Sequence, residues 1–268
     1  MTPRPLPLLL LALALTAAAC ASYTVEGDFA GRPLNGHAEP ALTIVLIHNH
    51  GFSRAQAGTY RPATPPILRF AADRNPDVVV FSQVRNIANP TAADHAAFIE
   101  SAVAHFHTER GVPIENIILA GQSCGGWGSL YAAAYRYPTI GGVLAFAPTC
   151  HGKLPHPPEV RARRARELVK LAERLRAQGT IFVYEGDSYY DVAEWDGFAT
   201  RTAGRAPWLR IVRVSRPRVL ELCDFCGRDS HGAYWDGRFA AAFFDDHVQT
   251  LIDGIRARIR ARLAASAH

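Results

Sequence analysis

The chain has 268 residues, of which 49% are hydrophobic and 20% are charged. This composition is typical of a folded globular protein and excludes disordered, fibrous and low-complexity classes. The length fits two ordinary domains or one large α/β unit. The only long apolar run is too short to span a bilayer, which excludes a polytopic membrane protein.

The first residues have the pattern of an export signal. An uninterrupted apolar stretch, 8–19, is followed by Cys20. Such a short core is typical of a secretory signal. Residues 15–20 resemble the bacterial lipoprotein box, which implies lipidation of Cys20; a plain signal cut nearby is the alternative. We expect 1–19 to be a signal peptide and the mature protein to be exported from a bacterium, either periplasmic or membrane-attached through Cys20.

The basic charge is concentrated in two segments. The formal net charge is +5. Residues 159–176 hold seven basic and three acidic residues, net +4, and four arginines within 256–262 add four more, so the remainder sums to −3. Both segments have helical periodicity, which places this charge on exposed helix faces. No nucleic-acid-binding motif accompanies it, so we expect no nucleic-acid partner.

Strands and helices are predicted to alternate along the chain. Strands separated by crossover helices indicate an α/β fold, with a mainly parallel sheet flanked by helices on both faces. No linker divides the chain, so we expect one domain over 41–268 after a lead-in over 20–40. The predicted strands are 41–47, 77–81, 116–120, 142–146, 180–184 and an alternating edge strand 209–214; the predicted helices are 91–111, 125–137, 158–177 and 236–263.

A glycine-rich turn directly follows the strand 116–120. Residues 121–126 are Gly-Gln-Ser-Cys-Gly-Gly, and a predicted helix comes next. A sharp strand-to-helix turn crowds the backbone and needs glycine two residues before and two after Ser123. Such a turn raises the serine hydroxyl above the sheet and aims the N–H of Cys124 at a reacting carbonyl oxygen. The pattern predicts a nucleophilic serine; a turn that serves only packing is the alternative.

This turn, together with His50-Gly51 after an earlier strand and later Asp and His residues, resembles the α/β-hydrolase superfamily over about residues 40–262. Within it, the chain is similar to small lid-less esterases of the dienelactone-hydrolase and feruloyl-esterase kind. The resemblance implies a serine hydrolase that cleaves a small-molecule carboxylic ester through an acyl-enzyme, without a cofactor. Only about 30 residues separate 142–146 from 180–184, which leaves no room for a large lid.

The resemblance also assigns the partners of Ser123. The family order of serine, acid and histidine implies Asp187 as the acid and His231 as the base. The N–H of Phe52, after the early His-Gly motif, becomes the second oxyanion donor beside Cys124. The alternatives are Glu185, Asp191 and Asp196 for the acid, and His151 and His247 for the base.

Aromatic residues are expected to surround the substrate. The segment 188–208 is the predicted pocket wall, and an apolar or aromatic acyl group would suit it. Trp127 also fits a packing role beneath the turn. The predicted pocket residues are Trp127, Tyr189, Tyr190 and Trp235, with Phe52, Trp195 and Trp208 as further candidates.

Four cysteines remain besides Cys20. Their even number in an exported chain favours disulfides, in any of three connectivities; free buried thiols are the alternative. The Cys-x-x-Cys pair 223–226 also fits a redox pair or half a zinc site. Tannase-like esterases imply one further hypothesis, in which a disulfide ties the serine loop to the histidine loop. The four cysteines are Cys124, Cys150, Cys223 and Cys226.

Three other functions fit the same residues. One is a serine peptidase of the same fold, and another is a non-catalytic binding lipoprotein on a hydrolase scaffold. The third is a metal-dependent hydrolase, in which His48 and His50 at a strand end would begin a zinc site. The strand ends that follow offer few further ligands, which favours the serine enzyme with no metal.

Overall fold

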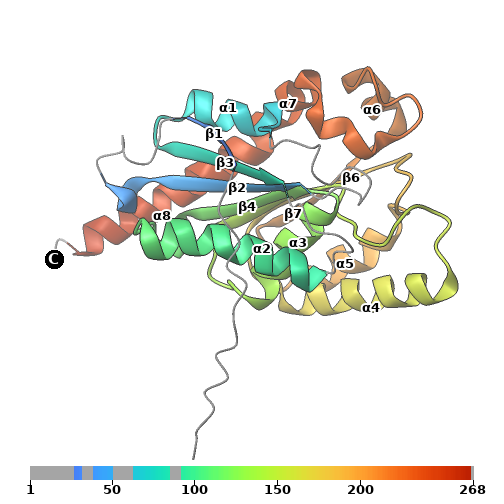
Figure 1. Ribbon diagram of the computed structural model, residues 1–268, viewed down its shortest axis with the longest axis horizontal. Coiled ribbons are helices and arrows are strands. Elements are labelled where there is room, and N and C mark those ends of the chain that lie inside the picture. The colour runs from blue at the N-terminus through green and yellow to red at the C-terminus, as the bar shows by residue number, and fades with distance from the viewer. Residues whose placement is uncertain (1–26, 32–38, 51–62, 85–91, 267–268) are drawn as a thin grey trace, which may run out of the picture.

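In the computed structural model of the chain, seven strands form one sheet in the order β1-β3-β2-β4-β5-β6-β7 (Figure 1). The structure describes residues 27–31, 39–50, 63–84 and 92–266. The predicted signal peptide, Cys20 and Phe52 lie outside these residues. Among the helices that are described, none has both the length and the apolar character needed to cross a membrane.

All six predicted strands form, and they run parallel to one another. Every residue of the central strands β4, β5 and β6 is buried, as expected where helices cover both faces of a parallel sheet. A short strand that the sequence pattern did not predict, β1 (Asp28–Ala30), pairs antiparallel with β3 at one edge. The parallel strands are β2 (Ile44–His50), β3 (Val78–Val84), β4 (Ile117–Gln122), β5 (Gly142–Phe146), β6 (Gly179–Tyr184) and β7 (Leu209–Val214).

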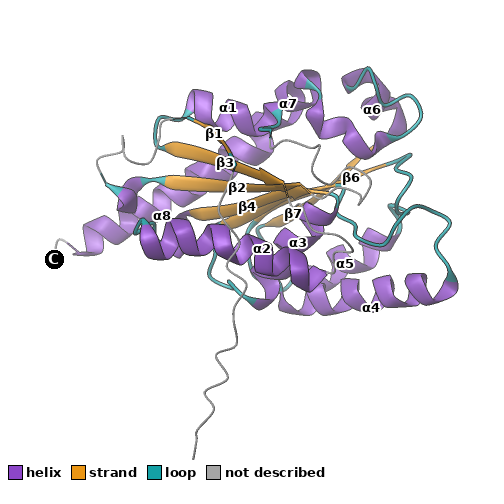
Figure 2. Cartoon of the chain, viewed as in Figure 1, coloured by secondary structure: helices purple, strands orange, loops and turns teal. Residues whose placement is uncertain are grey.

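Helices cover both faces of the sheet, as predicted (Figure 2). One group packs together on one face: α1 (Pro66–Arg74), α7 (Gly237–Phe243) and α8 (Thr250–Ser266). The opposite face carries α2 (Ala92–Ala104), α3 (Cys124–Tyr135), α4 (Pro158–Arg174) and α5 (Glu194–Thr202).

Three short helices were not predicted: α1, α5 and α6 (Arg216–Leu222). They have seven to nine residues each, too few turns for a clear periodic signal. The helix α5 lies within the segment predicted to form the pocket wall, but it buries Trp195 and Phe198 and packs against α4. The single terminal helix predicted over 236–263 is instead α7, a π-helical turn (Phe244–Gln249) and α8.

The six parallel strands end at the same edge of the sheet, on the right in Figure 1. The loops after β4, β5 and β6 meet there, and α6 lies above them in this view. Ligand sites of open parallel sheets form at this carboxyl edge. The fold therefore brings the predicted serine, acid and histidine loops to one side of the molecule.

Candidate active site

Ser123 lies at the turn from β4 into α3 in a rare backbone conformation. Its φ is 55° and its ψ is −127°. A positive φ is costly for a residue with a side chain, and such strain is typical of functional turns. Ala147, directly after β5, is the other non-glycine residue with positive φ in the described part of the chain. The predicted sharp turn at the serine is therefore present.

The two glycines around the serine are required by close backbone contacts. A Cβ added to Gly121 would lie 2.4 Å from the carbonyl carbon of Gly125. A Cβ added to Gly125 would lie 2.0 Å from the backbone oxygen of Asn49 on β2. Real Cβ atoms do not approach backbone atoms this closely, so both positions need glycine for β4, α3 and β2 to pack as they do.

The backbone around Ser123 is held on both sides. Its N–H donates to the carbonyl of Phe146 at 3.0 Å, and its carbonyl accepts from the N–H groups of Trp127 at 3.0 Å and Thr149 at 3.2 Å. Cys124 is the first residue of α3. An N–H in the first turn has no partner within its own helix and lies at the positive end of the helix dipole. The N–H of Cys124 therefore has a position suited to the oxyanion role expected for it from the sequence.

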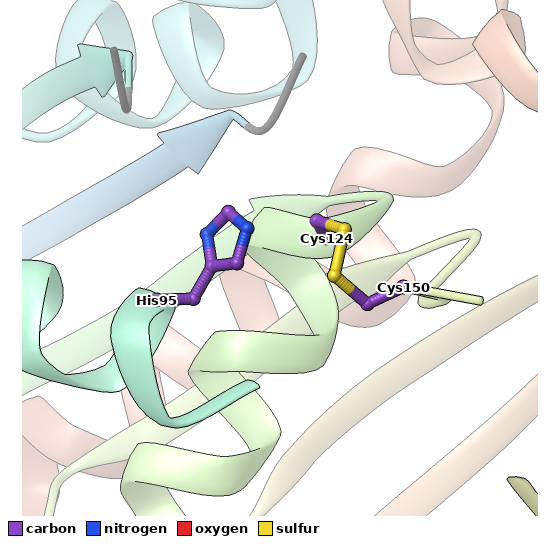
Figure 3. Close-up of side chains that lie close together, drawn as sticks. All are labelled: His95, Cys124 and Cys150. Atoms are coloured by element: carbon purple, nitrogen blue, oxygen red, sulfur yellow. A yellow bond between two sulfur atoms is a disulfide. The ribbon is translucent and has the colours of Figure 1, made fainter. Parts of the chain in front are cut away.

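A disulfide joins the residue after the serine to the loop after β5. Cys124 and Cys150 are bonded, and the side chain of His95 on α2 points toward them (Figure 3). The second disulfide is the local link Cys223–Cys226. Disulfides were predicted without their pairing. The hypothesis of a disulfide between the serine and histidine loops is wrong, because each of these cysteines has a different partner.

Asp187 and His231 are in direct contact. The Nδ1 atom of His231 lies 2.7 Å from Oδ2 of Asp187, whose side chain is 0% exposed. The other carboxylate oxygen, Oδ1, accepts from the N–H of Tyr189 at 2.8 Å. The other candidate acids have different partners: Glu185 accepts from the N–H of Arg216, Asp191 from the N–H of Ala193, and Asp196 from the guanidinium of Arg213.

The histidine loop is bonded to the end of the serine strand. The side-chain amide of Gln122 donates to the backbone oxygen of His231 at 3.0 Å, and Gln122 directly precedes Ser123. The Nε2 atom of His231 is buried and has no hydrogen-bond partner among the described residues, Ser123 included. Contacts between nucleophile and base are often loose before substrate binds and tighten in the complex.

The other candidate bases lie elsewhere. His151 bonds Glu167 at 3.0 Å and packs edge-on against Trp127. His247 packs against Phe182 and belongs to the turn before α8. Their environments therefore fit packing roles rather than that of the base.

Asp229 joins the acid and histidine loops, a role that sequence reasoning missed. Its Oδ1 accepts from the N–H of Ser188 at 3.1 Å and from the N–H of His231 at 3.0 Å. Its Oδ2 accepts from the hydroxyl of Ser188. Burial alone would raise the pKa of the Asp229 carboxyl, but these hydrogen bonds lower that pKa below its ordinary value. An aspartate two residues before His231 is a typical helix N-cap, and this was the available signal.

The aromatic surroundings differ from the prediction. The Tyr189 ring packs against the His231 ring at a tilt, with centroids 4.2 Å apart. The ring centroids of Trp235 and His50 are 6.0 Å apart, so Tyr189 and Trp235 lie near the histidine loop and the end of β2. Trp127 and Tyr190, which were predicted to line the pocket, are buried in the core at 1% and 2% exposure and offer little surface to a substrate.

Two further candidates are also displaced from the predicted pocket. Trp195 is 1% exposed and packs in the core with Phe198. Trp208 is 75% exposed but directly precedes β7, at the opposite end of the strands from Ser123. The pocket wall therefore does not extend over the whole segment 188–208.

His48 and His50 are both held neutral. Burial, followed by repulsion from His50, lowers the pKa of His48 to about 3. Burial and repulsion from His231 lower the pKa of His50 to about 4, against the opposing effect of a hydrogen bond with Gln122. Neither histidine belongs to a cluster of three potential metal ligands among the described residues.

One cluster of three potential ligand residues does occur in the described part of the chain: His95, Cys124 and Cys150 (Figure 3). Its two sulfur atoms are bonded to each other, so the cluster offers a single ligand atom. A zinc site needs three or four protein ligands. The donor set in this cluster does not fit a metal ion.

No protein-family model matches the chain, and no curated protein matches it by sequence. Solved structures do share its fold. A monoacylglycerol lipase of Paleococcus ferrophilus is similar with a TM-score of 0.52 and 15% identity, over 87% of this chain and 98% of that chain. A dipeptidyl peptidase 4 of Porphyromonas gingivalis is similar with a TM-score of 0.52 and 14% identity, over 77% of this chain and 32% of that chain. The chain therefore has the α/β-hydrolase fold.

Proposed function

We propose that the protein is a serine esterase that hydrolyses a carboxylic ester through an acyl-enzyme on Ser123. The observation that carries the proposal is the hydrogen bond of 2.7 Å between Asp187 and His231. The backbone of His231 is in turn bonded to Gln122, the residue directly before Ser123. A non-catalytic binding protein has no need for a strained serine next to a residue that bonds the loop of a paired histidine.

The first step forms a tetrahedral intermediate on Ser123. The Asp187 carboxylate accepts a hydrogen bond from the Nδ1–H of His231, which keeps the proton on Nδ1 and leaves Nε2 as the basic nitrogen. Nε2 takes the proton of the Ser123 hydroxyl while the hydroxyl oxygen of Ser123 attacks the ester carbonyl carbon. The N–H of Cys124 stabilises the oxyanion, and the second donor is assigned to Phe52, outside the described residues.

The second step releases the products. His231 gives the proton to the alcohol oxygen as the bond from that oxygen to the carbonyl carbon breaks. A water molecule then attacks the acyl-enzyme, with Nε2 accepting its proton, and the carboxylic acid leaves as Ser123 regains its hydrogen. The buried carboxylate of Asp187 stabilises the imidazolium that forms in each step.

Export and lipidation at Cys20 remain part of the proposal. The two disulfides favour an oxidising compartment, because such links rarely persist in the cytosol. Metabolic labelling with a palmitate analogue in a bacterial host tests the assignment. A Cys20→Ala variant should lose the label and leave the membrane fraction; an unlabelled wild-type chain would contradict lipidation.

The reaction is tested with a matched ester and amide of the same acyl group, p-nitrophenyl butyrate and butyryl p-nitroanilide. We expect ester hydrolysis that disappears in Ser123→Ala and is unchanged by EDTA. Faster cleavage of the anilide would favour the peptidase, and loss of activity with EDTA would favour a metal enzyme. No hydrolysis of either compound by a folded wild-type protein would favour the binding protein.

A further inference from the structure

A large apolar side chain is exposed beside the histidine loop. Phe225 is 61% exposed and occupies the loop closed by the Cys223–Cys226 disulfide. Single exposed apolar residues are common on protein surfaces. Phe225 differs from such residues in the position of its ring beside the histidine loop and in the contacts that fix its loop.

Contacts on both sides fix the loop that carries the ring. The N–H of Asp224 donates to the carboxylate of Asp236 at 3.2 Å, and the Asp224 carboxylate pairs with Arg238 at 2.5 Å. Arg216 donates to the carbonyl of Gly227 at 2.8 Å, just after the loop. Together with the disulfide, these contacts hold the backbone around Phe225, so little ordering entropy is lost when a ligand meets its ring.

The ring of Phe225 lies against the residue that follows His231. A Cβ added to Gly232 would lie 3.3 Å from Cε2 of Phe225. The Tyr189 ring packs against the His231 ring itself, with centroids 4.2 Å apart and the planes tilted by 31°. Tyr189 therefore contacts the base itself, and Phe225, from a different loop, contacts the residue next to the base.

The proposed reaction determines which part of a substrate would meet these rings. The alcohol oxygen must come within hydrogen-bond reach of Nε2 of His231 to receive its proton. The acyl carbon, in contrast, is bonded to Ser123. The alcohol portion therefore extends from the His231 side of the site.

We propose that Phe225 and Tyr189 form a subsite for the alcohol portion of the ester, and that this portion carries a flat apolar group. This inference rests on the proposed function and specifies the substrate class, an ester whose aromatic group lies on the alcohol side of the ester bond. It differs from the apolar or aromatic acyl group expected from the sequence, because three of the aromatic residues behind that expectation, Trp127, Tyr190 and Trp195, are buried.

The test compares three esters: ethyl acetate, 2-naphthylmethyl acetate and ethyl 2-naphthylacetate. Ethyl acetate has no aromatic group, 2-naphthylmethyl acetate carries one on the alcohol side, and ethyl 2-naphthylacetate carries one on the acyl side. We expect Phe225→Ala to lower kcat/KM for 2-naphthylmethyl acetate by about 5-fold, mainly through a higher KM, since one aromatic contact contributes a factor of this size. The other two esters should change less than 2-fold.

Two further variants complete the design. Trp208→Ala removes an aromatic residue that is more exposed than Phe225 and lies at the far end of the strands, and it should change kcat/KM for none of the three esters. Phe225→Leu keeps the apolar character without the flat ring and should give an intermediate loss. An equal loss for all three esters, or a loss confined to the acyl-side ester, would overturn the alcohol subsite.

The two proposals fail in different ways. If wild type hydrolyses the esters and Phe225→Ala changes none of them, the subsite is wrong and the esterase stands. If wild type hydrolyses no ester, both proposals are overturned together.

Discussion

The Nδ1 atom of His231 lies 2.7 Å from Oδ2 of Asp187, although 44 positions separate the two residues in the chain. Asp187 follows β6, and His231 belongs to the 3₁₀ helix Ser230–Trp235 beyond β7 and α6. The parallel pairing of β6 with β7 brings these two loops to the same edge of the sheet. The contact is thus a consequence of topology as well as of local sequence.

Replacing the acid tests the role assigned to this contact. Asp187→Asn keeps the shape but allows His231 to adopt the tautomer whose Nε2 carries the proton. We expect kcat for ester hydrolysis to fall by about 10³-fold or more, with KM little changed. Asp191→Asn is the control, because that carboxylate bonds the N–H of Ala193 and should leave kcat as it is. Equal effects of the two substitutions would contradict the assignment.

Asp229 should influence the rate without touching the substrate. Asp229→Ala removes the acceptor shared by the N–H groups of Ser188 and His231, and we expect kcat to fall by about 10-fold through misplacement of the imidazole. Asp229→Asn keeps an acceptor oxygen and should recover most of the loss.

A second helix-capping aspartate gives the matched control for that experiment. Asp236 accepts from the N–H of Arg238 at the start of α7, in the same way that Asp229 caps its own helix. Asp236→Ala should lower stability to a similar extent while leaving kcat per folded molecule unchanged. A parallel loss of kcat would mean that Asp229 has only a structural role.

Much of this arrangement could be predicted from sequence, for identifiable reasons. The buried strands are short runs of β-branched and apolar residues, and β4 ends directly at the glycines that the turn at Ser123 requires. Asp187 and His231 were implied by the resemblance, whose order of serine, acid and histidine could be placed on the predicted strand ends. These features depend on local spacing, which a single sequence displays.

The features that were missed depend on contacts between distant segments. Trp127 looks like a pocket residue by proximity to Ser123, but helix geometry turns it into the core, beside Arg164 of α4. The Cys124–Cys150 pairing depends on how the loop after β5 returns to α3. The position of Phe225 against Gly232 likewise arises only when the loop before the histidine folds.

The two disulfides should differ in their contribution to stability. Cys124–Cys150 closes a loop with a separation of 26 residues, whereas Cys223–Cys226 spans 3. In the chain-entropy model, a disulfide lowers the entropy of the unfolded chain. The two links then raise the free energy of unfolding by about 3.5 kcal/mol for Cys124–Cys150 and about 1.6 kcal/mol for Cys223–Cys226. Urea unfolding of Cys150→Ala and Cys226→Ala should therefore show the larger loss for Cys150→Ala; the reverse order would contradict this account.

The buried histidines should make stability fall with decreasing pH. In the unfolded chain the imidazoles titrate near 6.5, but the folded pKa values are about 3 for His48 and about 4 for His50. The unfolded state therefore binds more protons below pH 6.5. The free energy of unfolding should decrease from there toward pH 4, by up to about 1.4 kcal/mol per pH unit for each histidine.

Denaturant unfolding between pH 7 and pH 5 measures how the free energy of unfolding changes with pH. Ordinary carboxyl groups titrate below this pH range and contribute little to the slope. A double variant, His48→Gln with His50→Gln, should have a flatter slope whatever its absolute stability. A slope equal to that of the wild type would show that other groups carry the pH dependence.

The most direct test of the account is the mass of the protein after reaction with a fluorophosphonate, which bonds covalently to an activated serine. We predict addition of one phosphonyl group per chain, located by peptide mapping at Ser123, unaffected by EDTA and absent from His231→Ala. An unmodified wild-type protein, or a label on any other residue, would contradict a nucleophilic Ser123.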